Sequence, residues 1–268
     1  MISANLLPLV RCAAQADLTV TMTTNGFTLS PEAARHLAEA GLGYLALSLD
    51  GFDQVHNQIR QRSDAFSLAL RAMTHATDNG LRVRINCVIC ELNLELLPGF
   101  ITWVRDNPRL ESIFFQALAQ PFGEPSRENW WQAEPLFPKN PARAGEVLRE
   151  LLDMKRAGFP ILNPDGQFAA LSAYFENPEQ FVLGQCRVGA MGLTIDAAGV
   201  VRLCSRYEPI GDLMQGHSLR AIFKSAKAEQ VRAEMAACRR NCHLLINCCF
   251  EENGAPDLRG AAADPSSQ

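Results

Sequence analysis

The chain has 268 residues, of which 47% are hydrophobic, and it carries a formal net charge of −4 at pH 7. This length and apolar content predict a packed globular protein with one large domain, or a medium domain and a smaller one. The acidic balance provides no basic stripe, which argues against nucleic acid as a partner. No stretch reaches the roughly 18 apolar residues of a membrane span, and no leader is recognisable after Met1, so we expect no membrane partner and a cytoplasmic location.

Four apolar, β-branched runs in the first half predict β-strands, and helical patterns lie between them. The strands are expected at residues 18–24, 44–49, 81–89 and 112–118. The helices are expected to begin at Ser30 and to cover residues 64–80 and 93–106. Strands that alternate with helices predict a parallel α/β sheet, either open or curved into a barrel.

Polar residues stand at the carboxyl ends of these strands, where parallel β/α folds place functional groups. Asn25 begins an Asn-Gly pair after the first strand, and Ser48 lies two residues before the Asp-Gly pair of Asp50. Either pair alone is most simply a turn, because both suit positive φ. Two pairs at equivalent positions favour a site. Asn86 and Gln116, in the next two strands, are expected to satisfy backbone groups at the same rim.

The second half changes character after a proline-rich crossing at residues 119–141. Its predicted elements are helices over 142–157 and 168–175, a β-hairpin over 191–204 and a helix over 218–237. We therefore predict four regions: a β/α part at 1–141, a helical connection at 142–185, a small cysteine-rich α+β domain at 186–252 and a disordered tail at 253–268.

The most informative feature of the chain is a set of spaced cysteines in its last third. They are Cys186, Cys204, Cys238, Cys242 and Cys248. Four thiolates from separate parts of a chain suit an iron–sulfur cluster or a zinc ion. Zinc motifs usually offer two close pairs, whereas here two isolated cysteines frame the hairpin and three form Cys-x3-Cys-x5-Cys. This spacing favours a [4Fe–4S] cluster over zinc or free thiols, and Cys249, adjacent to Cys248, is the least suitable ligand.

These segments together resemble the radical S-adenosylmethionine (radical SAM) enzymes that end in a SPASM or twitch domain. The resemblance covers residues 1–252 and rests on the Asn-Gly and Ser-Leu-Asp-Gly segments, on His56 and Arg60, and on the cysteine pattern. It implies a partial (β/α)6 barrel with parallel strands three to six, followed by a SPASM/twitch α+β domain with an auxiliary [4Fe–4S] cluster.

The resemblance also implies which residues bind S-adenosylmethionine or substrate. These are Asn25, Ser48, Asp50 and Arg60. Arg60 could pair with the methionyl carboxylate through its two-pronged guanidinium. A plain helix-face arginine in a charged stretch is an equally good interpretation of Arg60.

The chain departs from the family at its start. Family members hold the primary cluster with a Cys-x3-Cys-x2-Cys loop, and this spacing does not occur here. We expect Cys12, Cys87 and Cys90 to be buried structural thiols rather than substitutes for that loop. The first strand matches the family's third, so we expect a chain shortened by two β/α units and inactive alone, with no catalytic residue assigned.

A complete protein of this family would generate a 5′-deoxyadenosyl radical to modify a peptide or a small molecule, with flavodoxin or ferredoxin as electron donor. Two alternatives stay open for this chain. One is a non-catalytic iron–sulfur or substrate-binding partner protein, and the other is a zinc-stabilised interaction module. The coding sequence upstream of Met1 and metal analysis of the purified chain distinguish them.

Overall fold

The computed structural model describes residues 5–120, 127, 129–179, 186–240, 242, 244–248 and 250. Two compact units divide the chain: residues 1–118 with 136–163 form the first, and residues 119–135 with 164–268 form the second. The predicted tail at 253–268 lies outside the described residues. Within the described part, no helix combines the length and apolar character needed to cross a bilayer.

The first unit is built on a four-stranded parallel sheet with the strand order β1-β2-β3-β4. Its strands are β1 (Thr21–Thr24), β2 (Tyr44–Ser48), β3 (Arg82–Ile89) and β4 (Ser112–Ala117). All four lie within the predicted runs, and the prediction of a parallel α/β sheet is confirmed.

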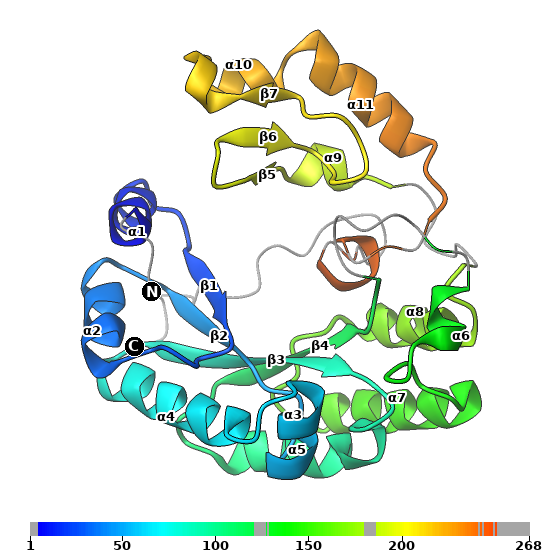
Figure 1. Ribbon diagram of the computed structural model, residues 1–268. Coiled ribbons are helices and arrows are strands. Elements are labelled where there is room, and N and C mark those ends of the chain that lie inside the picture. The colour runs from blue at the N-terminus through cyan, green and yellow to red at the C-terminus, as the bar shows by residue number, and fades with distance from the viewer. Residues whose placement is uncertain are drawn as a thin grey trace. The chain divides into compact units, whose positions relative to one another are not determined.

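Helices cover one face of this sheet, as Figure 1 shows. The covering helices are α2 (Pro31–Glu39), α4 (Ala65–Asp78), α5 (Leu97–Asp106) and α7 (Pro141–Arg156). The unit also contains α1 (Leu6–Gln15), the short α3 (Asp53–Ile59) and η1 (Leu94–Leu96). The start of α2 follows prediction, because Ser30 accepts a hydrogen bond from the Ala33 N–H at 3.1 Å. Helix α7 packs against α5, so it belongs to the first unit, whereas the sequence placed it in a connection.

Strand β3 shows how the two faces of the sheet differ. Val83, Ile85 and Ile89 are fully buried on the helix-covered face. Arg84 and Asn86 alternate with them and are only half-buried. We call this second side of the sheet the inner face. Its polar residues indicate that it serves contacts other than packing against helices.

The two edge strands of the sheet, β4 and β1, differ in what pairs with them. Residues 160–163 continue the sheet beyond β4, since Ile113 donates to the Pro160 carbonyl at 2.9 Å and accepts from Leu162 at 2.9 Å. Asn163 extends the same ladder with its side chain, which exchanges two hydrogen bonds of 2.8 Å with the Phe115 backbone. At the opposite edge, β1 pairs only with β2 among the described residues, which leaves one row of its backbone groups without a strand partner.

The second unit contains a small antiparallel sheet with the order β5-β6-β7. Its strands are β5 (Thr194–Ile195), β6 (Val200–Arg202) and β7 (Gly211–Asp212). The helices and helical turns are α6 (Trp130–Ala133), α8 (Asp165–Glu176), α9 (Val188–Met191), η2 (Leu213–Gln215), α10 (Leu219–Phe223), α11 (Ala226–Ala236) and η3 (Leu244–Cys248). The predicted hairpin is present, with Gly199 at φ +88° in its turn.

The single helix predicted over 218–237 is wrong. Two helices, α10 and α11, occupy this segment. Ser225 separates them, because its hydroxyl accepts a hydrogen bond from the Ala228 N–H at 3.1 Å and starts α11.

Candidate functional site

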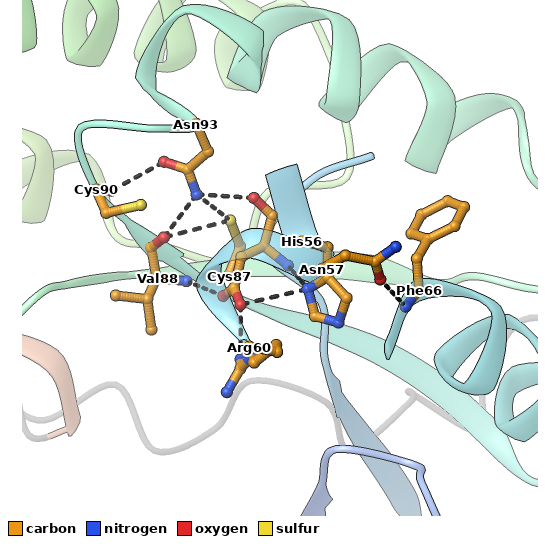
Figure 2. A network of polar contacts seen from close by, with 9 residues as sticks. His56, Asn57, Arg60, Phe66, Cys87, Val88, Cys90 and Asn93 are labelled. Atoms are coloured by element: carbon orange, nitrogen blue, oxygen red, sulfur yellow. Dashed lines mark hydrogen bonds and ion pairs between the residues drawn. The ribbon is translucent and has the colours of Figure 1, made fainter. Parts of the chain in front are cut away.

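A buried polar network joins the carboxyl ends of β2 and β3 (Figure 2), and the contacts of Asp50 lie at its centre. Asp50 is 0% exposed. Its Oδ1 accepts a hydrogen bond from the Val88 N–H at 3.0 Å, and its Oδ2 lies 2.7 Å from Arg60 Nη2. A buried carboxylate needs such partners, because burial otherwise penalises its charge. Asp50 therefore ties β2, β3 and the end of α3 together at the rim where the sequence predicts a site.

His56, in α3, is fully buried beside Asp50. Its Nδ1 accepts a hydrogen bond from the Asp50 backbone N–H at 3.1 Å, so this nitrogen carries no proton and the ring N–H is at Nε2. Nε2 has no hydrogen-bond partner among the described residues. His56 therefore acts through its acceptor nitrogen, which holds the start of α3 against the end of β2.

Arg60 is directed at Asp50 and is not a solvent-facing helix residue. Its side chain is 29% exposed, its Nη2 forms the ion pair with Asp50, and its Nε is buried without a hydrogen-bond partner among the described residues. One prong of the guanidinium is thus already engaged by a carboxylate of this chain. Because of this ion pair, Arg60 is less available to bind the carboxylate of a ligand.

Asn93 completes the network, and the sequence analysis did not identify it. The residue is 0% exposed and stands just before η1. Its Nδ2 donates to the carbonyl oxygens of Asp50 at 2.8 Å and Val88 at 2.7 Å, and its Oδ1 accepts from the Cys90 N–H at 2.8 Å (Figure 2). An asparagine before a helix normally suggests a cap. Here the amide instead reaches back and satisfies three backbone groups at the ends of β2 and β3.

Asn25 forms a turn. It is exposed, and its Oδ1 accepts a hydrogen bond from the Phe27 N–H at 3.1 Å. Gly26 follows at φ +78°, where an added Cβ would lie 2.7 Å from Ala72 Cβ. The Asn-Gly pair is thus explained by the backbone geometry after β1, although Asn25 still lies at the same end of the sheet as Ser48 and Asp50.

Ser48 shares the inner face with the cationic side chain of Arg84, which its sequence context did not mark as part of the site. Ser48 lies opposite Asn86 in the ladder, and Ala46 lies opposite Arg84, so Arg84 is on the same face one step below. The Arg84 guanidinium stacks 3.4 Å from the centroid of the Tyr44 ring. Its buried Nε has no hydrogen-bond partner among the described residues. An anionic group on the inner face would therefore meet a more available cation in Arg84 than in Arg60.

Replacing Arg84 with methionine is expected to raise the free energy of unfolding by about 1 kcal/mol. An unpaired buried donor destabilises the fold by about 1–3 kcal/mol, and the change removes this penalty. The change also removes a cation–π contact that stabilises the fold by about 0.5–2 kcal/mol. Urea unfolding measures the difference. Arg82→Met is the matched control, because Arg82 stacks on the same ring but is ion-paired with Glu111. A loss of stability in Arg84→Met larger than in the control would show that Arg84 serves packing.

Of the three cysteines predicted to be buried structural thiols, two follow the prediction. Cys87 and Cys90 are buried, and Asn93 contacts both, through Cys87 Sγ at 3.8 Å and the Cys90 N–H. Cys12 is exposed on α1, so the prediction of burial is wrong at this position. Helix α1 buries Val10 and leaves the side that carries Leu9 and Cys12 exposed, since a surface helix buries one stripe only.

The stability of the first unit is expected to fall at alkaline pH through Cys90. Burial raises the pKa of this thiol to about 11. A folded-state pKa above the unfolded value means that stability is intact below about pH 9 and is lost as the pH rises through about 11. Wild type should lose up to about 2–3 kcal/mol more than Cys90→Ala over this window, as measured by denaturant unfolding. Parallel pH profiles of the two proteins would contradict the assignment.

Four of the five predicted ligand cysteines share one neighbourhood in the second unit. Cys204 is part of its hydrophobic core, and Cys186 and Cys242 pack against the same core. Burial raises the pKa of the Tyr207 hydroxyl, and the neighbouring Cys238 thiol raises it further. Burial raises the pKa of the Cys186 thiol. Three neighbouring thiols raise this pKa further: those of Cys242, Cys238 and Cys204.

A backbone amide donates a hydrogen bond to one of these sulfur atoms. The Arg206 N–H donates to Cys204 Sγ at 3.5 Å. The pKa of the Cys186 thiol is lowered by the Val188 amide, and that of Cys242 by the Leu245 and Leu244 amides, although burial is the larger effect and raises both values. Hydrogen bonds to sulfur stabilise thiolates and tune the clusters that they hold.

The fifth predicted ligand, Cys248, ends η3 and is exposed. Within the described residues, no three His, Cys, Asp or Glu side chains come close enough to hold a single metal ion. The four thiols therefore share a neighbourhood without forming a ready-made site for one ion among these residues.

The family match among known proteins lies within the first unit. Residues 3–101 match the family model described as the Radical SAM superfamily. This segment belongs to the radical SAM superfamily. The match includes β1, β2, β3 and the whole Asp50 network, so the family expected from the sequence is confirmed for the first unit.

Two curated relatives extend the radical SAM likeness. The chain is 25% identical over 183 residues to the Fe-coproporphyrin III synthase of Methanosarcina barkeri, covering 66% of this chain and 45% of the relative. It is 34% identical over 161 residues to the GTP 3′,8-cyclase of Erythrobacter litoralis, covering 60% of this chain and 44% of the relative. The chain thus spans less than half the length of these two relatives.

Solved radical SAM structures share the fold. The anSMEcpe structure with bound AdoMet and Cp18Cys peptide superposes with a TM-score of 0.62 at 17% identity, over 91% of this chain and 69% of that chain. Streptococcus suis SuiB bound to the precursor peptide SuiA gives a TM-score of 0.58 at 13% identity, over 92% and 57%. At these identities the likeness establishes the fold, and the predicted radical SAM type of α/β fold is confirmed.

Proposed function

We propose that this chain is the part of a SPASM- or twitch-type radical SAM protein that carries an auxiliary [4Fe–4S] cluster. The proposed ligands are Cys186, Cys204, Cys238 and Cys242. The observation that supports this most directly is their common neighbourhood in the second unit, where the Arg206 N–H donates a hydrogen bond to the Cys204 sulfur. Such a cluster, when bound, gives or takes one electron.

The spacing of the thiols favours a cluster over zinc. A zinc ion draws four sulfur atoms to about 2.3 Å from one centre, so the atoms must nearly touch one another. In a [4Fe–4S] cluster each thiolate binds its own iron, so the thiolates stand farther apart. Two isolated cysteines around the β5–β6 hairpin, followed by the Cys-x3-Cys pair of Cys238 and Cys242, are closer to the auxiliary-cluster arrangement than to the two close pairs of a zinc motif. Cys248 is the reserve ligand of the predicted set.

The inner face of the first unit is the proposed place for S-adenosylmethionine and substrate. Ser48 and Asn86 offer hydrogen-bonding groups there, and Arg84 offers a cation. We assign an anionic group of cofactor or substrate to Arg84, because Arg60 is already paired with Asp50. Asp50 and Asn93 would act as positioning residues that hold this rim in place.

A peptide is the proposed substrate class, with a small molecule as the other possibility. Two of the similar solved structures are complexes with a peptide, Cp18Cys in one and SuiA in the other. The curated relatives with higher identity carry the names of small-molecule enzymes. Flavodoxin or ferredoxin is the proposed electron donor, as the family resemblance implies.

One feature favours a second candidate, a non-catalytic iron–sulfur or substrate-binding partner. The chain contains no Cys-x3-Cys-x2-Cys segment, and so the thiolates of a primary cluster would have to come from residues other than these 268. Incubation of the chain with S-adenosylmethionine and dithionite is therefore expected to give no 5′-deoxyadenosine. Detectable 5′-deoxyadenosine would overturn the view that this chain lacks a primary cluster.

Metal analysis tests the auxiliary cluster. The chain is purified without oxygen, reconstituted with iron and sulfide, and desalted. We expect about four iron and about four sulfide per chain, with absorption near 400 nm that bleaches on reduction. One zinc per chain without iron would sink the proposal and support a zinc-stabilised module.

A further inference from the structure

The cysteine-bearing part of the second unit has a charge opposite to that of the whole chain. Residues 186–248 contain nine Lys and Arg and five Asp and Glu, whereas the full sequence has a formal net charge of −4. The excess positive charge is therefore concentrated in the part that carries the candidate cluster ligands. Local charge of one sign attracts partners of the other sign and steers their approach.

Five of the seven arginines of this segment form two groups, and the first group serves the fold. Arg232 donates to the Gly189 and Phe223 carbonyl oxygens at 3.0 and 2.7 Å and pairs with Glu229. Arg202 donates to the Tyr207 carbonyl at 3.3 Å. Both side chains are half-buried, so their charge is used within the unit.

The second group is exposed and lies next to the candidate ligands. Arg206 stands two residues after Cys204, and Arg239 and Arg240 directly follow Cys238. None of these three arginines forms an ion pair with a described residue, and the hydrogen bonds of Arg239 go only to the carbonyl groups of its own turn. Their charges are therefore available to another molecule.

The fold brings these arginines to one place. Tyr207, the neighbour of Arg206, donates to the Glu234 carbonyl at 3.2 Å and packs against the core that contains Cys204. The loop that carries Arg206 is thus held against the end of α11, and Arg239 and Arg240 follow shortly after that end. Cys186, Cys238 and Cys242 are only half-buried beside them, so a partner bound at the arginines would come close to the sulfur atoms.

We propose that Arg206, Arg239 and Arg240 form a docking surface for an acidic one-electron carrier protein. The inference rests on the auxiliary cluster of the proposed function. Reduced carrier gives one electron to the oxidised cluster, so the carrier is oxidised by one electron and the cluster is reduced by one, with no bond or proton transferred. Surfaces that work through charge rather than large apolar area give fast, weak encounters, as electron transfer between proteins requires.

The test measures reduction of the cluster in the reconstituted full chain by photoreduced flavodoxin, followed in a stopped-flow spectrometer. The variant is Arg206→Gln/Arg239→Gln/Arg240→Gln. Its second-order rate constant at low ionic strength should fall at least about tenfold, and its dependence on salt should flatten. Reduction by photoreduced deazaflavin, a small molecule that needs no docking surface, should be unchanged.

The matched control is Arg35→Gln/Arg62→Gln/Arg105→Gln, which removes the same charge from exposed positions of the first unit. It should keep the wild-type rate. Equal rates in the two triple variants would overturn the docking surface, even if four iron are bound, whereas a chain that binds no iron would overturn the auxiliary cluster itself. If the arginine variant loses binding of a polyglutamate peptide but keeps the wild-type reduction rate, the surface takes an acidic peptide and the carrier proposal is wrong.

Discussion

Asp50→Ala is expected to lower the free energy of unfolding of the first unit by about 3–5 kcal/mol. The change removes the partner of Arg60 and the acceptor of the Val88 N–H in a site where Asp50 is fully buried. Asp50→Asn should cost less, about 2 kcal/mol, because the amide can still accept from Val88 and the 29% exposed Arg60 can turn to water. Denaturant unfolding followed by circular dichroism measures both.

The matched control is Asp64→Ala, which breaks the exposed ion pair with Arg62 and should leave stability nearly unchanged. The double variant Asp50→Ala/Arg60→Ala separates the charge from the packing. If the ion pair dominates, removing Arg60 as well should recover part of the loss, because no unpaired cation is left. Additive losses in the double variant would instead assign the effect to the Val88 hydrogen bond and to the cavity.

The strands of the first unit were predictable because each is a local run of β-branched and apolar residues. Helix α3 was not predicted, since it has seven residues and Phe52, which offers no capping side chain, precedes it. Contacts with other parts of the first unit hold it, among them the hydrogen bond from the Asp50 N–H to His56 and the packing of α3 against α4. A helix held by tertiary contacts leaves little signal in its own sequence.

In the candidate site, too, residues with a local sequence signal were predicted, and residues whose roles depend on tertiary contacts were not. Ser48 and Asp50 were found because a β/α repeat places functional groups after its strands. Asn93 and Arg84 were missed, because their roles depend on which residues face them across the ladder and in the next turn. Arg60 was assigned to a ligand from resemblance, whereas its partner in the fold is the carboxylate ten positions earlier.

In the second unit, the sequence predicted the number and type of the thiols but left the ligand set open. The spacing Cys-x3-Cys-x5-Cys gave no reason to prefer Cys242 or Cys248 beside Cys238. The fold supplies that reason, since Cys242 packs against the core that contains Cys204, whereas Cys248 is exposed at the end of η3. Chain folding, rather than spacing, decides which sulfur atoms share a neighbourhood.

Cys204→Ser is accordingly expected to reduce the iron content of the reconstituted chain more than any other single change. Cys204 is 8% exposed within the core of the unit, and the Arg206 N–H is directed at its sulfur. Loss of an outer-shell partner alone weakens metal binding about 10–100-fold, so loss of a thiolate should exceed that. Iron and sulfide analysis and the absorption near 400 nm measure the effect.

Three further serine variants make this result specific to the proposed ligand set. Cys12→Ser, at an exposed thiol of α1, should keep the full iron content and controls for the loss of any cysteine. Cys248→Ser should also keep it, whereas Cys242→Ser should lose it. The reverse order, with iron retained in Cys242→Ser and lost in Cys248→Ser, would move the fourth ligand to η3. The turn would then have to close over the cluster on binding, because Cys248 is exposed in the fold described here.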